Sequence, residues 1–121
     1  MQENDNFTTI CIDAKCGRIR LSKNMLSGLG YPKYIQLLIN TEKQKIAIRC
    51  VDKDVPDAQT IRIKPIEKMT SKAYEFTSKT LTDKLVEAIG IVDGNCSYRL
   101  SGTVFSPERI AVFPFDTVEK V

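Results

Sequence analysis

Apolar and polar residues alternate along the first part of the chain in a way that predicts two β-hairpins joined by a short helix. Ile19 and Leu21 would lie on one side of a strand, because successive side chains of a strand point to opposite faces. Arg18 and Arg20 would share the other side, and Gly17 before them suits a tight turn. The same reasoning gives the elements of this part: strands over residues 8–13, 18–21, 35–40 and 45–50, and a helix beginning at residue 23.

The ends of this helix carry recognisable signals. Ser22 suits the N-cap position, where a hydroxyl accepts a hydrogen bond from an otherwise unpaired amide of the first turn. Gly30 supplies the C-terminal stop, and Pro32 shortly after it cannot continue a helix. We therefore expect a short helix that packs through an apolar stripe containing Met25 and Leu26.

The second part of the chain repeats this order with looser spacing. Ser22 followed by Gly30 is matched by Ser78 followed by Gly90. Ser78, or the threonine before it, is expected to cap the second helix, and Gly102 is expected to form a bulge or a bend. The expected elements are strands over residues 60–66, 73–76, 96–101, 103–106 and 110–113, and a helix over residues 79–89.

The duplication predicts how the chain folds as a whole. A small unit that cannot bury its apolar face alone should pack against its own copy. With 121 residues the chain is long enough for one core but too short for two independent domains. We predict a single pseudo-symmetric domain over residues 1–121, mostly β with two short helices (α+β). It comprises a first repeat over residues 8–50, a linker over residues 51–59 and a second repeat over residues 60–115.

Basic residues are concentrated in the first repeat. Between positions 15 and 50 there are eight basic residues against Glu42 as the one acid, whereas nine basic and nine acidic residues fall between positions 55 and 121. A polyanionic partner would therefore meet the first repeat. The alternative is that these lysines and arginines serve only solubility and the protection of strand edges.

Composition argues against an enzyme, a metal protein and a membrane protein. The chain has no histidine, so a serine or cysteine nucleophile would lack its commonest base, and no carboxylate pair stands in a shared context. The cysteines are Cys11, Cys16, Cys50 and Cys96. They form no Cys-x-x-Cys pair, which predicts reduced thiols and neither a metal site nor a cofactor. No window resembles a membrane-spanning helix and the first residues are unlike a signal peptide, so we expect a soluble, cytoplasmic protein.

One stretch of the first repeat matches a known pattern. The run Gly-Arg-Ile-Arg-Leu-Ser from Gly17 to Ser22 leads into a helix ending in Leu-Gly, followed by the strands of residues 35–40 and 45–49. This order resembles the AbrB/SpoVT/MazE swapped-hairpin DNA-binding family, and the tandem arrangement is similar to MraZ. Ser22 stands where the family usually has proline, and the second repeat lacks the Gly-Arg turn. The resemblance implies a swapped-hairpin barrel with the helices outside, closed by a homodimer or within one chain.

The resemblance also implies which residues bind DNA. In that family basic residues around the first hairpin turn and strand grip the duplex, and the matching positions here are Lys15, Arg18, Arg20 and Lys23. Their cationic groups can neutralise phosphates and release counterions, and arginine can read guanine edges. Three lysines of the second repeat are weaker candidates because acidic residues lie close to them in sequence: Lys68, Lys72 and Lys79. We therefore expect a transcriptional regulator that binds duplex DNA.

A second interpretation keeps the scaffold without affinity for DNA. A protein-interaction or assembly module of phage or mobile-element type would use the same fold, since fold alone does not fix function. A neutral second repeat would suit such a module, as would exposed aromatic residues at Tyr31, Tyr34, Phe113 and Phe115. The partner would then be a second copy of the chain or another protein.

Overall fold

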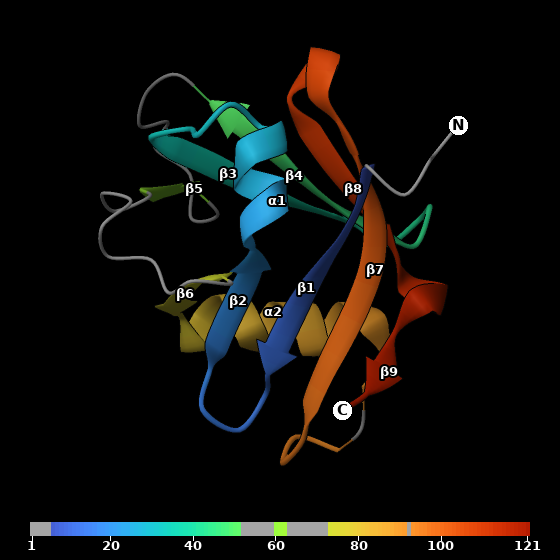
Figure 1. The fold of residues 1–121 in the computed structure, drawn as a ribbon. Helices are drawn as coiled ribbons and strands as arrows, with labels where there is room; N and C mark the ends of the chain where they lie inside the picture. Colours follow the sequence, from blue (N-terminus) through green and yellow to red (C-terminus); the bar gives the residue numbers. More distant parts are fainter. Residues whose placement is uncertain (1–5, 52–59, 63–72, 92) are drawn as a thin grey trace.

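Strands make up most of the molecule and form one antiparallel sheet that curls into a half-barrel (Figure 1). The computed structural model describes residues 6–51, 60–62, 73–91 and 93–121, and nine strands and two α-helices lie in these ranges. In chain order the elements are β1 (Phe7–Asp13), β2 (Arg18–Ser22), α1 (Lys23–Gly28), β3 (Tyr34–Asn40), β4 (Lys45–Val51), β5 (Thr60–Arg62), β6 (Ala73–Thr77), α2 (Lys79–Ile89), β7 (Ser97–Phe105), η3 (Ser106–Glu108), β8 (Ile110–Pro114), η4 (Phe115–Thr117) and β9 (Glu119–Lys120). The prediction of a mostly-β fold with two helices is confirmed.

Strands of the two repeats are interleaved in this sheet. The order across it is β5-β3-β4-β8-β7-β1-β2-β6, and β9 pairs with β7 beside this path. β1 pairs with β7, β3 with β5, β2 with β6 and β4 with β8, so each of these contacts joins one repeat to the other. The sheet therefore depends on both halves of the chain.

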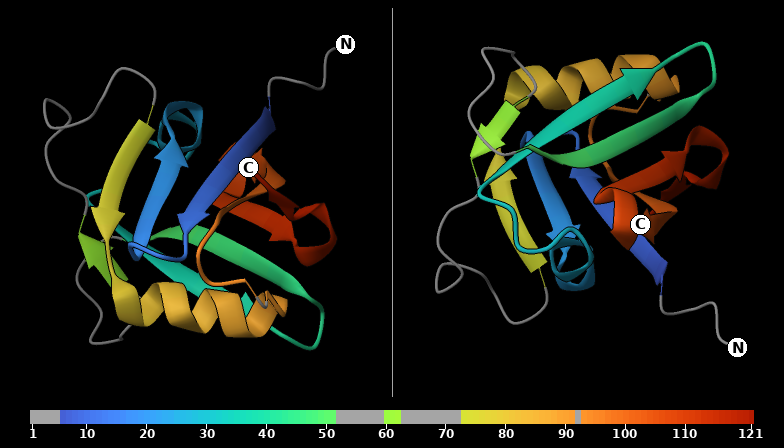
Figure 2. Two further views of the ribbon diagram at one scale, coloured as in Figure 1. Left: turned by 90° about the horizontal axis from the view of Figure 1, so that it is seen from below. Right: turned by 90° about the horizontal axis from the view of Figure 1, so that it is seen from above.

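The apolar sides of the strands face a single core. Its strand residues include Ile10, Ile12, Ile19, Leu21, Ile35, Leu37, Ile46, Ile48, Leu100, Ala111 and Phe113. Met25 and Leu26 from α1 and Leu81 and Leu85 from α2 complete it. The views from below and above place the two helices on opposite sides of the molecule (Figure 2).

α2 begins and ends where the sequence predicts. The Ser78 hydroxyl accepts a hydrogen bond from the Leu81 amide at 3.3 Å, which caps the helix, and Gly90 ends it in the left-handed conformation. For α1 the predicted glycine stop is also confirmed, because Gly30 has a φ of +81°.

Ser22 holds the N-cap position of α1 as predicted, but the predicted capping hydrogen bond is absent. Ser22 is extended and makes no side-chain cap hydrogen bond. Its hydroxyl is instead hydrogen-bonded to Thr8 on the neighbouring strand and to the Asn24 side chain. One tertiary partner, Thr8, and one local partner, Asn24, thus replace the first-turn amide that the sequence suggests.

Two predictions in the second repeat also need correction. The strands expected over residues 96–101 and 103–106 are a single strand, because β7 runs continuously through Gly102 and pairs with β1 from Ser97 to Thr103 in unbroken register, without a bulge. Phe113 is fully buried and Phe115 nearly so, since both belong to the core. Only Tyr31 of the four predicted aromatic residues is among the exposed large apolar side chains.

Some predictions fall outside the residues that the structure describes. These include residues 52–59 of the predicted linker, residues 63–66 of the predicted strand, and both Lys68 and Lys72. Val51, assigned to the linker by the sequence, belongs to β4.

Candidate nucleic-acid interface

The turn between β1 and β2 is docked against the start of α2. The Ser78 amide donates a hydrogen bond to the Gly17 carbonyl at 2.8 Å. Gly17 has a φ of +72°, and a β-carbon there would lie 3.0 Å from the Cα atom of Lys79. Both the backbone conformation and the close approach therefore require glycine. The Gly-Arg turn is thus held by the second repeat.

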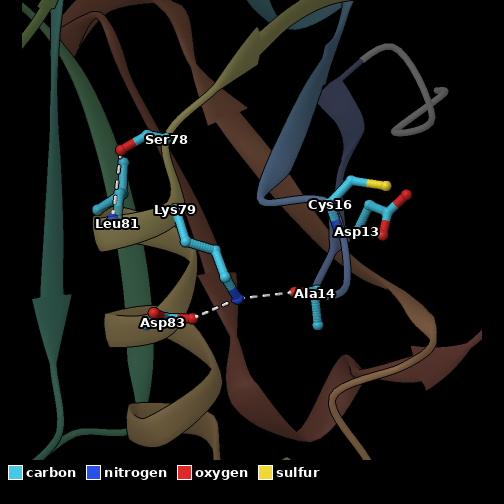
Figure 3. A network of polar contacts seen from close by, with 7 residues as sticks. All are labelled: Asp13, Ala14, Cys16, Ser78, Lys79, Leu81 and Asp83. Carbon is cyan, nitrogen blue, oxygen red and sulfur yellow. Dashed lines mark hydrogen bonds and ion pairs between the residues drawn. The ribbon is translucent and has the colours of Figure 1, made fainter.

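This docking brings one of the weaker candidates to the first hairpin. The Lys79 ammonium donates to the Ala14 carbonyl at 3.3 Å and lies 3.0 Å from the Asp83 carboxylate (Figure 3). Lys15 is exposed in the same turn. Lys79 therefore belongs spatially with the first repeat, although its sequence neighbours place it in the second.

Asp13, at the end of β1, forms a hydrogen bond within the turn between β1 and β2. The Asp13 carboxylate accepts a hydrogen bond from the Cys16 amide at 3.1 Å, which lowers the pKa of Asp13 below its ordinary value. Asp13 is also the register partner of Arg18 on β2. The carboxylate stays ionised and reduces the positive potential around Arg18.

Arg18 and Arg20 both lie on the outer face of β2, as the alternation predicts. Arg20 is half exposed, and its Nε donates to Glu75 Oε2 on β6 at 2.9 Å. This hydrogen bond and the charge of Glu75 raise the pKa of Arg20. Glu75 of the second repeat thus forms an ion pair with Arg20, one of the basic residues that are concentrated in the first repeat.

Arg20 belongs to a row of residues that crosses the outer face of five strands. Following the register from β6 through β2, β1 and β7 to β9, the row is Glu75, Arg20, Cys11, Arg99 and Glu119. We call this set the arginine row. Arg99 mirrors Arg20, with its Nη2 2.7 Å from Glu119 Oε1. An ion pair flanks the central cysteine on either side.

A depression lies on this face beside the central strand β1. It has a volume of about 300 Å³ and is open to solvent. Its lining consists of Cys11, Ile12, Asp13, Arg18, Arg20, Ser97 and Val121. Burial raises the pKa of the Cys11 thiol, and the nearby Arg20 and Arg99 offset part of that effect. Cys11 is therefore a neutral thiol rather than an activated nucleophile.

Lys23 stands apart from the other candidates. It is exposed at the start of α1, at the opposite end of β2 from the turn that holds Lys15. The five residues of β2 separate these ends by roughly 17 Å. The predicted cations thus form a group at the turn and the face of β2, with Lys23 outside it.

Sequence reasoning missed Arg99. The alternation along β7 is enough to place it outward, yet only the pairing of β7 with β1 puts it beside Cys11 and two strands from Arg20. No local signal in the sequence indicates that pairing.

In the part of the chain that the structure describes, no group of three or more potential metal ligands comes together. No helix there is long and apolar enough to cross a membrane. Comparisons of the chain with protein-family models, with curated proteins and with solved structures find no match.

Proposed function

We propose that this protein binds duplex DNA through the turn between β1 and β2 and the outer face of β2. The observation that carries the proposal is the grouping of exposed cations there: Lys15 in the turn, Arg18 and Arg20 on the strand, and Lys79 docked beside them. A transcriptional regulator of the swapped-hairpin type is the function that the family resemblance implies for this surface. Lys23 would contact DNA only at the edge of such a footprint.

The order of strands supports the swapped-hairpin part of this proposal. Suppose that β1, β2, β3 and β4 of the first repeat correspond in order to β5, β6, β7 and β8 of the second. Exchanging the repeats then turns the pairing of β1 with β7 into the pairing of β5 with β3, which the sheet also contains. The pairs β2 with β6 and β4 with β8 convert into themselves. Interlocked copies of one hairpin unit would produce this arrangement.

Glu75 lowers the affinity for DNA that we propose for this surface, but it does not abolish DNA binding. An exposed ion pair contributes only about 0–1 kcal/mol, because water and salt screen it. A phosphate would take over the charge-assisted hydrogen bonds that Glu75 accepts from Arg20, and each neutralised phosphate also releases a counterion. A phosphate can therefore displace the Glu75 carboxylate from Arg20, most readily at low salt.

The test is a titration of labelled, mixed-sequence duplex DNA, followed by fluorescence anisotropy at several salt concentrations. The double variant Arg18→Ala, Arg20→Ala should raise the Kd at least tenfold and reduce the salt slope by about two, because two phosphate contacts are lost. The matched control is Lys33→Ala, Lys43→Ala, which removes two exposed charges from elsewhere on the chain. A folded double arginine variant with wild-type affinity would contradict the proposal.

Exposed aromatic residues favour a second candidate, a protein-interaction module. Phe7 is 53% exposed and Phe105 is 45% exposed. Phe7 lies opposite Thr103, two residues from Phe105, so the two rings are diagonal neighbours on the outer face of the sheet. Absence of DNA binding at low salt, together with self-association in sedimentation that Phe105→Ser abolishes, would support this candidate.

A further inference from the structure

We propose that Arg99 and Arg20 together bind one phosphate group of the DNA backbone above Cys11. The DNA footprint would then cross from the first repeat onto β7 of the second. This inference rests on the DNA-binding function proposed above and extends it to a residue that the family resemblance does not indicate. The ligand is a phosphodiester group of the duplex.

The register places the two arginines at a suitable separation. Both are direct neighbours of Cys11, Arg20 on β2 and Arg99 on β7. Neighbouring strands lie about 4.8 Å apart, so the two backbones are separated by roughly 10 Å. Two arginine side chains can close this gap on one phosphate, and a guanidinium can donate two parallel hydrogen bonds to phosphate oxygens.

The two guanidinium groups point away from each other. Arg20 reaches toward Glu75 on β6, and Arg99 reaches toward Glu119 on β9. The depression reaches Cys11 and Arg20 but not Arg99, and its other lining residues are Ile12, Asp13, Arg18, Ser97 and Val121. A phosphate above Cys11 would lie beside this depression and attract both cations, which otherwise repel each other.

Both ion pairs are exposed enough to be exchanged for a phosphate. The side chains of Arg20 and Glu75 are 53% and 32% exposed, and those of Arg99 and Glu119 are 42% and 54% exposed. Exposed pairs of this kind contribute little to stability. Asp13 also lines the depression, but its carboxylate accepts the Cys16 amide in the turn and is held there. The two glutamates thus act as internal competitors of the phosphate.

The first experiment measures DNA affinity of Arg99→Ala in the full chain. Loss of one phosphate contact should raise the Kd about fivefold to tenfold and reduce the salt slope by about one. Lys43→Ala, which removes one exposed charge in the turn between β3 and β4, should change the Kd less than twofold. Circular dichroism and urea unfolding establish that both variants are folded.

A second variant tests the proposed competition directly. Glu119→Gln removes the carboxylate that holds Arg99, so the Kd should fall about twofold to fivefold. When Glu119→Gln is combined with Arg99→Ala, it should lower the Kd much less, because only the change in net charge then favours DNA binding. An equal gain in both backgrounds would contradict a contact between Arg99 and DNA.

The Cys11 thiol offers a readout that does not depend on affinity. Saturating DNA should slow alkylation of Cys11 at least fivefold, measured by mass spectrometry, while Cys50 on the distant strand β4 keeps its rate. Unchanged alkylation of Cys11 in the complex would overturn the inference.

The experiments separate the two proposals. If Arg18→Ala, Arg20→Ala weakens binding while Arg99→Ala behaves like Lys43→Ala, the phosphate pair is refuted and DNA binding stands. If the wild-type chain binds no duplex at low salt, both proposals fail.

Discussion

Gly102 lies where β7 passes close to the backbone of β8. A β-carbon at this position would overlap the Val112 carbonyl oxygen and lie 2.6 Å from Cδ2 of Phe113. Backbone and a fully buried ring cannot move aside easily in a close-packed core. The absence of a side chain at this residue is therefore a requirement of the sheet.

We expect Gly102→Ala to lower the free energy of unfolding by about 1–3 kcal/mol, because overpacking forces the strands apart. Gly94 is the matched control, since a β-carbon there would meet nothing within 4 Å. Gly94→Ala should change stability by less than about 0.5 kcal/mol. Urea unfolding followed by circular dichroism measures both, and equal stability of the two variants would refute the steric argument.

At the scale of elements, the two helices begin in different ways. Ser78 caps α2 with its own hydroxyl, and the same residue anchors the turn between β1 and β2 through its amide. Ser22 is the N-cap residue of α1, but its hydroxyl makes no capping hydrogen bond and is bonded to Thr8 on β1 instead. α2 is thus held by its own cap, whereas the position of α1 depends on tertiary contacts.

Ser78→Ala should destabilise the protein by about 1 kcal/mol, because the Leu81 amide loses its side-chain acceptor. Ser78→Asp should stay close to wild type, since aspartate caps equally well and its charge is favourable at a helix N-terminus. The midpoint of urea unfolding distinguishes them. A loss in the aspartate variant as large as in the alanine variant would mean that the hydroxyl contributes through something other than capping.

At the scale of the whole molecule, the two repeats share their strands and their core. β7 of the second repeat lies between β1 of the first and β8 of the second. Leu37 on β3 and Leu100 on β7 are both fully buried in the same cluster. Neither repeat can then lose its strands without exposing apolar surface of the other.

We therefore expect the chain to unfold in one cooperative transition. Leu37→Ala and Leu100→Ala, in different repeats, should each lower the free energy of unfolding by about 2–5 kcal/mol through the cavity they leave. Circular dichroism and tyrosine fluorescence should report the same midpoint in each variant. Two separate transitions, each shifted by only one of the substitutions, would show that the repeats are independent.

Local pattern was sufficient for most elements and for most of the core, with Phe113 and Phe115 as exceptions. The alternation of Ile19 and Leu21 with Arg18 and Arg20 gives the two faces of β2, and Gly90 gives the end of α2. These features depend on residues within a few positions of one another, because side chains repeat every two residues in a strand and helix ends are closed by adjacent groups. They can therefore be read from one sequence.

The candidate site depended on contacts between distant parts of the chain. Arg20 meets Glu75, which is 55 positions away, and Lys79 meets the turn at Ala14, which is 65 positions away. Ion pairs at the surface are too weak to determine which distant parts of the chain become neighbours. Burial of the apolar sides of both repeats in one core selects the strand partners and their register, and the charges on the outer face follow. The sequence alone thus determined most of the strands, both helices and the buried side of strands such as β2, whereas the tertiary structure decided that Phe113 is buried and which charges oppose each other.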